Sequence, residues 1–225
     1  MKIDRIRLLT TSVLAVTFLF IISQTSFAGS PLLCQPFDIG QAKSLPVGSG
    51  SWKAIKADYD TRRLVDDTVA LLTSNTPIIA RMETLRRATL YVMNNEKLAR
   101  DLHSRLAARA QKSSNDALAQ FDLGYLEETY KQATVISRMV AGAKSFDGYS
   151  RVIRAIEMRK GDADMEFAAA LIASHPKRKA MNEHLQRAIV SATDGSMLGR
   201  NLVQHFRDLG SNLAQLKARF GVAKN

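Results

Sequence analysis

Apolar residues recur at steps of three and four positions through most of the chain after residue 54. Within 95–111, for example, Leu98, Leu102, Leu106 and Ala110 follow one another at intervals of four. Such spacing lines one face of an α-helix, whereas the strict alternation of a half-buried strand is not found. The pattern predicts an all-α protein with helices at 56–73, 77–94, 95–111, 116–141, 148–160, 162–174, 177–192, 196–209 and 211–220.

Residues 29–53, which we call the lead-in, differ in composition from the segments that follow. They hold three of the five prolines of the chain and several glycines, which oppose both helix and strand. We expect an extended linker that limited proteolysis cuts first, with Trp52 anchoring its end to an all-helical domain at 54–225. A lead-in that resists proteolysis would instead indicate that it packs into a groove of that domain.

The first 28 residues have the three-part layout of a secretory signal peptide. Three basic residues precede an apolar stretch at 8–22, and Ser26 and Ala28 occupy positions −3 and −1 of a cleavage site after Ala28. The apolar stretch is shorter than the roughly 20 residues that a membrane-spanning helix needs. Removal of 1–28 is therefore favoured over a retained membrane anchor. We expect a periplasmic or secreted protein that begins at Gly29 and has no transmembrane span after processing.

Cys34 is the only cysteine, so no disulfide can form within the chain. Because Leu33 precedes it and lipid-modified cysteines need a small residue there, we do not expect a lipoprotein. Pairing between molecules and a reactive thiol remain alternatives. The flanking prolines and apolar residues favour a small buried hydrophobe at the start of the domain.

A shift of 46 residues brings similar segments into register. It aligns 103–126 with 149–172 and places Phe121 on Phe167, and a second step places Ser196 on Ser150. A period between 20 and 50 residues is typical of stacked helical units. It predicts units near 96–141, 142–187 and 188–225, although a chance alignment is the alternative.

The second helix of each unit resembles the tetratricopeptide repeat in its A-x3-F pattern with a later proline. The residues that carry this resemblance are Ala163, Phe167, Ala170 and Pro176, and again Ala117, Phe121 and Gly124. The resemblance implies antiparallel helical hairpins in a solenoid-like array, and an irregular helical bundle is the alternative. In such hairpins Phe121 would pack against 95–111 and Phe167 against 148–160. Ala117 and Ala163 would then lie where the helices approach closely.

The sequence contains no recognisable catalytic or metal-binding motif. The histidines His103, His175, His184 and His205 include no pair at the i, i+4 spacing of a helical zinc site. His205 is expected at the edge of the core. The adjacent Glu127 and Glu128 cannot flank a glycosidic bond, and nothing singles out Glu166 or Glu183 as a partner acid. We assign no catalytic, cofactor-binding or metal-binding residue and expect no cofactor.

The chain is basic, with 32 lysines and arginines against 21 acidic residues and a net charge of +11. Removal of 1–28 leaves 29 against 20, or +9, which favours weak attraction to anionic envelope surfaces. Nucleic acid is not an expected partner of an exported chain. Short basic pairs such as Arg62–Arg63 and Arg86–Arg87 lack interleaved aromatic residues and are interpreted as solvated helix surface.

Two functional classes remain open from the sequence. The favoured one is an exported helical-repeat module that binds a protein or peptide partner, because stacked hairpins form extended binding surfaces. The alternative is a helical enzyme that acts on a cell-envelope polymer through carboxylates in a groove. The enzyme should bring acidic or histidine side chains together in one pocket, whereas a binding module should show a groove with dispersed charge.

Overall fold

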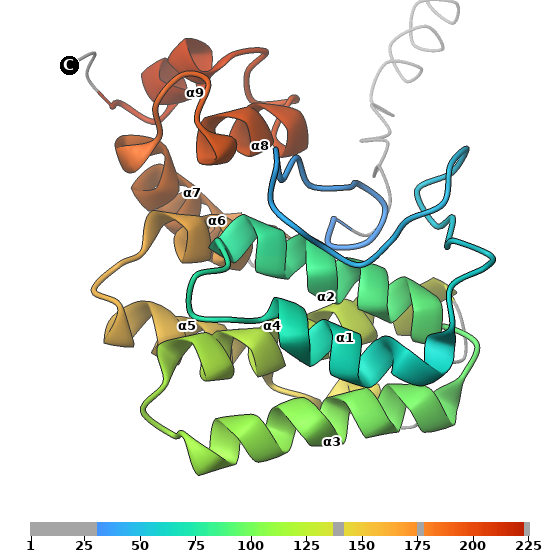
Figure 1. Ribbon diagram of the computed structural model, residues 1–225. Coiled ribbons are helices and arrows are strands. Elements are labelled where there is room, and N and C mark those ends of the chain that lie inside the picture. Colours follow the sequence, from blue (N-terminus) through green and yellow to red (C-terminus); the bar gives the residue numbers. More distant parts are fainter. Residues whose placement is uncertain (1–30, 137–141, 175–177, 223–225) are drawn as a thin grey trace, which may run out of the picture.

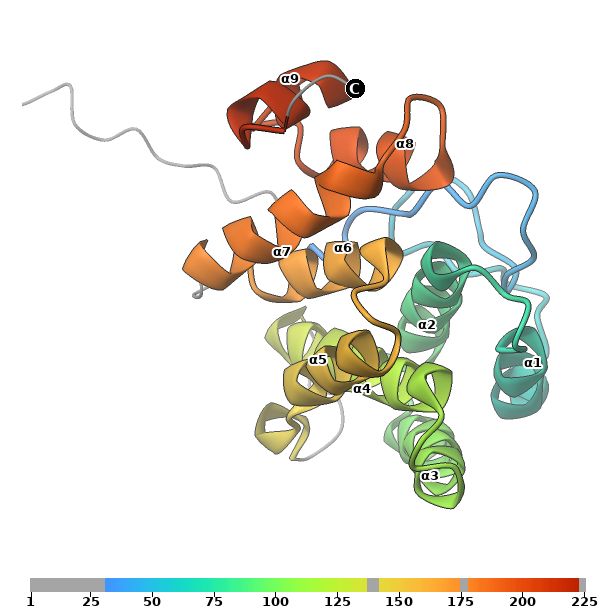
Figure 2. The same ribbon diagram turned by 90° about the vertical axis from the view of Figure 1, so that its left-hand side faces the viewer.

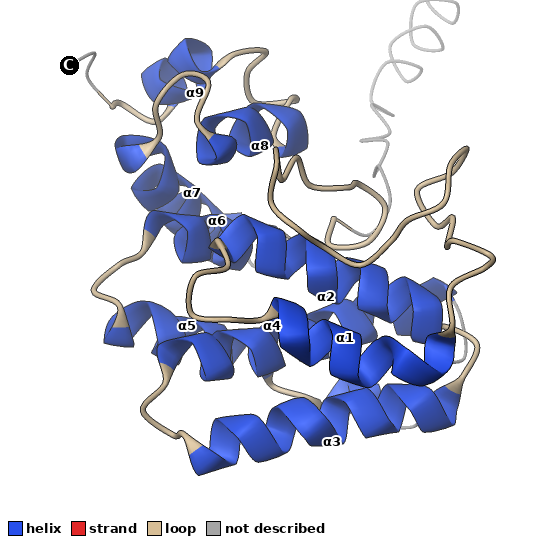
Figure 3. Cartoon of the chain, viewed as in Figure 1, coloured by secondary structure: helices blue, strands red, loops and turns tan. Residues whose placement is uncertain are grey.

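The computed structural model describes residues 31–136, 142–174 and 178–222 (Figure 1). Within these ranges the regular structure is helical and no strand is present, so the all-α prediction is confirmed (Figure 3). The α-helices are α1 (Leu64–Leu71), α2 (Ile78–Val92), α3 (Glu96–Lys112), α4 (Ala117–Ile136), α5 (Gly148–Met158), α6 (Ala163–Ile172), α7 (Arg178–Ser191), α8 (Met197–His205) and α9 (Leu213–Arg219). Short 3-10 turns lie at Thr61–Arg63 and Ala143–Ser145.

Most of the predicted helices match the observed ones to within a few residues, but the first begins late. The helix expected from residue 56 starts at Leu64, because Asp60 caps a 3-10 turn instead. Here the carboxylate of Asp60 accepts the backbone N–H of Arg62. At the start of α6, Asp162 accepts the N–H groups of Asp164 and Met165, as its position before an apolar run predicts.

From α3 at one end of the molecule, α4 to α7 follow toward α8 and α9 at the other end, and α2 lies against α4 (Figures 1 and 2). Helices α2 and α4 lie in the interior and are buried around almost their whole circumference. A helix in this position contacts neighbours on all sides, so its sequence lacks the clear apolar stripe of a surface helix. In the described part of the chain, no helix combines the length and the hydrophobicity needed to cross a membrane.

Helices α4 and α5 cross where two glycines face each other. A Cβ atom on Gly124 would lie 2.6 Å from the carbonyl oxygen of Gly148, and a Cβ on Gly148 would collide with the carbonyl oxygen of Gly124. Only hydrogen atoms fit at this crossing, which brings the backbones of the two helices together. Ala117 and Ala163, for which a close approach is predicted, are half-buried and pack against the edge of the core.

The arrangement of the helices does not support the 46-residue repeat. Helix α4 packs mainly on α5, and the shift maps these two helices onto α6 and α8. Helix α6, however, packs mainly on α7 and makes few contacts with α8. Phe121 and Phe167 are both fully buried, but their surroundings differ. Phe121 stacks on Tyr125 of its own helix. Phe167 makes its aromatic contacts with Phe37, His205 and Phe206, which lie in the lead-in and at the end of α8.

The lead-in is part of the packed body and not a linker. Its described part contains neither helix nor strand, as its composition predicts. However, Leu32, Leu33, Phe37 and Leu45 are buried within the same apolar core as the helices. The lead-in runs along α2 and passes beside α8 (Figure 1). Trp52 packs against this core, in agreement with its expected role as an anchor.

Candidate functional site

Side chains of α2 hold the backbone of the lead-in. Glu83 accepts the N–H of Phe37 through Oε2 at 3.1 Å, and it is bonded by both Arg86 and Arg87 at 2.6–2.9 Å. The two arginines in turn donate to carbonyl oxygens of the lead-in. These carbonyls belong to Leu33, Trp52 and Leu45, at 2.9, 3.0 and 2.5 Å. This network supplies the hydrogen-bond partners that buried backbone needs where no helix or sheet provides them.

The prediction that Arg86–Arg87 is solvated surface is wrong. Arg86 and Glu83 are fully buried, and Arg87 is largely covered. The sequence contains an indication of this burial. In α2 the charged residues occur among apolar residues that lie on every side of the helix. Buried charges need opposite charges and hydrogen bonds beside them. Arg62–Arg63 is exposed, as expected.

Side chains of α8 hold the lead-in next to the α2 network. The amide of Asn201 bonds both backbone groups of Asp38, accepting its N–H at 3.0 Å and donating to its C=O at 2.7 Å. Gln204 donates to the carbonyl of Pro36 at 2.9 Å. Arg200 bonds the carboxylate of Asp38 at 2.6 and 3.3 Å and lowers the pKa of that carboxyl group. Three polar residues on one helix thus bind two residues of the lead-in, Pro36 and Asp38.

The ring of Phe37 enters an aromatic cluster between α6 and α8. It stacks on His205 with centroids 4.5 Å apart and meets Phe167 edge-on at 6.1 Å. His205 lies at the edge of the core as predicted, and its Nε2 atom is buried without a hydrogen-bond partner in the described part of the chain. Burial lowers the pKa of His205 to about 4, so the ring is neutral at pH 7.

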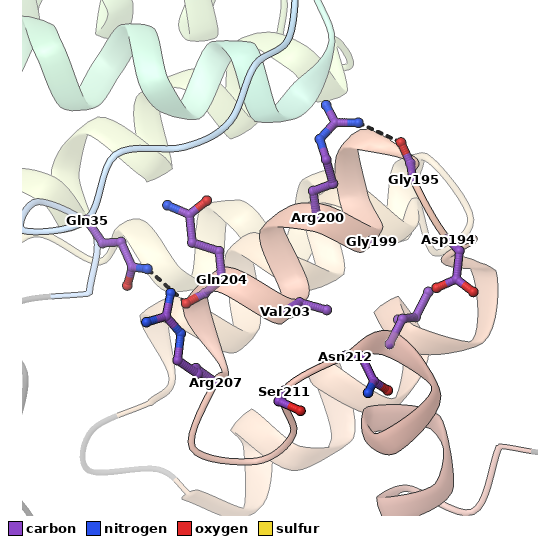
Figure 4. A pocket seen from close by; sticks show the side chains of 11 residues that line it. Gln35, Asp194, Gly195, Gly199, Arg200, Val203, Gln204, Arg207, Ser211 and Asn212 are labelled. Atoms are coloured by element: carbon purple, nitrogen blue, oxygen red, sulfur yellow. Dashed lines mark hydrogen bonds between the residues drawn. The ribbon is translucent and has the colours of Figure 1, made fainter.

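An open pocket of about 570 Å³ adjoins this segment of the lead-in (Figure 4). It lies between Gln35, α8 and the residues that lead into α9. Gln35 donates to the carbonyl of Gln204 at one edge, and Arg200 donates to the carbonyl of Gly195 at the other. Arg207 is exposed in the wall of the pocket and makes no ion pair with any residue that the structure describes. The one carboxylate in the lining is Asp194.

A second cluster joins α5, α6 and α7 through Glu166, His184 and Tyr149. His184 Nδ1 lies 2.5 Å from Glu166 Oε2, and His184 Nε2 lies 2.7 Å from the hydroxyl oxygen of Tyr149. Arg187 donates to the other oxygen of Glu166 at 2.7 Å. Because a carboxylate only accepts, the short contact places a proton on Nδ1. Arg187 Nη2, 2.8 Å from the same nitrogen, then makes a close contact and not a hydrogen bond.

The electrostatics of this cluster favour an ionised acid and a neutral phenol. Burial acts to raise the pKa of Glu166, but hydrogen bonds from His184 and Arg187 lower it below its ordinary value. Burial raises the pKa of Tyr149. The cluster lies apart from the pocket of Figure 4, and no residue is shared between the two. From the sequence, no residue could be assigned as a partner of Glu166. Its partner His184 lies on a different helix and is brought beside it only by folding.

The other acids considered from the sequence are also paired. Glu127 is buried between His103 at 3.2 Å and Arg151 at 3.1 Å, and Glu128 accepts from Lys131 at 2.8 Å. Glu183 is exposed, and its contact with Lys179 is 4.0 Å long. His175 lies outside the described residues. In the described ranges, no three His, Cys, Asp or Glu residues are grouped so that they could hold a metal ion.

Comparison with known proteins gives no match: neither a family model, nor a curated protein, nor a solved structure is similar to this chain.

Proposed function

We propose that this protein is an exported module that binds an extended segment of a protein or peptide partner. The observation that supports the proposal is the way in which the helical body holds its own lead-in. Side chains from α2 and α8 bond the backbone of a segment that has no regular structure. Hydrogen bonds to backbone, together with pockets for individual side chains, are a general means of binding extended peptides.

The positive charge of the whole chain favours a partner with acidic groups. The chain without residues 1–28 has a net charge of +9, and the pocket in Figure 4 exposes Arg207 together with one acid, Asp194. A positive field also gives weak attraction to anionic envelope surfaces. Export would place the module in the periplasm or outside the cell. N-terminal sequencing of the exported protein should begin at Gly29, and an intact Met1 on a membrane-bound product would contradict export.

Site-specific photo-crosslinking in the producing cells tests the binding function. A benzophenone amino acid replaces Arg207 in one variant and Arg154 in the control. Arg154 is exposed on α5, makes no ion pair with the described residues, and belongs to a helix that contributes no residue to the pocket. We expect a discrete crosslinked product of higher mass at residue 207 and none at residue 154. The same pattern at both positions, or no product at either, would contradict the proposal.

The Glu166–His184–Tyr149 cluster is the specific observation that favours the alternative, a hydrolase of cell-envelope polymers. A carboxylate that orients a histidine, which in turn bonds a hydroxyl group, is the arrangement of a general-base relay. Against it, Asp194 is the only acid in the pocket lining, so no carboxylate pair faces a groove. Release of dye from labelled peptidoglycan by the wild type, and its loss in Tyr149→Phe, would favour the enzyme over the binding module.

A further inference from the structure

The contacts of residues 35–38 are of two kinds. Together they specify which kind of peptide could bind at the same place. One kind involves backbone groups that any sequence possesses. Asn201 bonds both the N–H and the C=O of Asp38, and Glu83 accepts the N–H of Phe37. A primary amide that donates and accepts at the same residue copies the pairing of a neighbouring strand. These bonds select an extended chain without selecting its sequence.

The other kind involves side chains and therefore selects sequence. The aromatic ring of Phe37 fills the space between His205 and Phe167 and is almost fully buried. The next residue, Asp38, places its carboxylate on the guanidinium of Arg200 at 2.6 Å. An aromatic residue followed directly by an acidic residue satisfies both contacts. A pocket for an aromatic anchor beside a charged contact is typical of peptide-binding hot spots.

We propose that this surface of α2, α6 and α8 is a peptide-binding site that the lead-in occupies in the free protein. The partner is an extended segment of another chain that carries an aromatic residue followed by an acidic one, and it displaces residues 35–38. This inference rests on the proposed binding function and names the chemistry of the partner.

Residues 35–38 are joined to the helical body by the chain that follows them, which we call the tether. This covalent link explains why the lead-in fills the site in the free protein. A segment on the same chain competes at an effective concentration in the millimolar range, so a free peptide of equal affinity is strongly disfavoured. Residues 49–51 of the tether are exposed, and a Cβ on Gly50 would meet no atom within 4 Å. The tether can therefore be cut at this point without disturbing packed residues.

The experiment uses the full chain with a protease site inserted between Gly50 and Ser51. The probe is a fluorescein-labelled peptide that copies residues 31–42 and carries Cys34→Ser. After cleavage and equilibration with excess peptide, we expect the probe to bind at least tenfold more tightly than it binds the uncleaved chain. A control peptide that also carries Phe37→Ala and Asp38→Ala should bind at least tenfold more weakly than the probe.

Two variants of the chain keep the test decisive. Phe37→Ala in the uncleaved protein vacates the aromatic pocket and should raise probe binding without any cut. Asn201→Leu in the cleaved protein should reduce probe binding at least tenfold while far-UV circular dichroism shows intact helices. Failure of the probe to bind the cleaved chain, or equal binding of probe and control peptide, would overturn the inference. If either failure occurred but a partner were still crosslinked at residue 207, the proposed binding function would still hold and only this inference would be wrong.

Discussion

Acid should weaken the fold through His205, and the size of the effect follows from its surroundings. The imidazole lies against Phe37, and its Nε2 atom is buried without a hydrogen-bond partner in the described residues. Burial is the main reason why the pKa of His205 falls to about 4 from an ordinary value of 6.5, and Arg86 lowers it further. Glu83 and a backbone hydrogen bond at Pro36 act in the opposite direction. The unfolded chain therefore takes up this proton at higher pH than the folded chain does.

The linkage between protonation and folding gives the sign and the magnitude. A histidine with a lowered folded-state pKa contributes stability that is complete above about pH 6.5 and is lost as the pH falls toward 4. A difference of roughly 2.5 pKa units corresponds to about 3.4 kcal/mol when both states are protonated. At pH 4.5 the loss is about 2.5 kcal/mol, because the folded state has by then begun to accept the proton.

Two acids whose pKa is raised by burial, one of them only half-buried, oppose this effect and must be separated from it. Burial raises the pKa of Asp122 to about 6 despite its contacts with Arg81 and Arg109. Burial and Asp162 raise the pKa of Asp164 to about 6. For both acids the folded state binds protons first, so they stabilise the fold as the pH falls from 6 toward 4. The pH profile of the wild type alone therefore does not isolate the histidine.

The measurement is a difference between wild type and His205→Phe, which keeps an aromatic ring against Phe37. Urea unfolding followed by far-UV circular dichroism gives the free energy of unfolding of each protein at pH 7.5 and 4.5. We expect the variant to gain about 2.5 kcal/mol relative to wild type between these two pH values. His205→Gln should show the same relative gain despite a different stability at pH 7.5. Profiles that remain parallel within about 0.5 kcal/mol would refute the reasoning.

The remaining predictions concern packing and buried charge. Glu83→Ala leaves two arginines buried without their acid and should cost about 3–5 kcal/mol in urea unfolding, whereas the exposed control Asp101→Ala should change stability by less than about 0.5 kcal/mol. Phe121→Ala and Phe167→Ala should each cost about 3–5 kcal/mol in thermal melts, since both rings are fully buried; a near-zero change in either would contradict its core position. Gly148→Ala should cost about 1–3 kcal/mol or more, because the new methyl group collides with backbone of α4; unchanged stability would mean that the two helices separate easily.

The sequence predicts the helices of this protein better than it predicts their partners. Apolar residues at steps of three and four report burial of one face, and the stripe of α3 through Leu102 and Leu106 is an example. The same pattern does not say which helix lies against that face. The structure does not support the 46-residue frame for this reason, because similar segments such as those around Phe121 and Phe167 meet different aromatic neighbours.

Charged and polar residues inside helices were the least predictable part of the candidate site. Arg86 looks like solvated surface when only its sequence neighbours are considered, and Asn201 has no distinguishing motif. Their roles come from groups distant in the sequence: Arg86 reaches Leu33, and Asn201 reaches Asp38. Local periodicity cannot report such contacts. A charged residue on an otherwise apolar helix face is the signal that was available.

The lead-in is the clearest case of a correct local prediction with a wrong structural consequence. Proline and glycine exclude helix and strand, and the segment indeed has neither. A linker, however, also requires that the chain have little apolar surface to bury, and Leu32, Leu33, Phe37 and Leu45 provide that surface. Once these side chains enter the core, the backbone between them must find hydrogen-bond partners, and only side chains of the surrounding helices are within reach. The polar residues of α2 and α8 are therefore a consequence of burying an irregular segment. The same residues give this helical body the means to bind an extended chain.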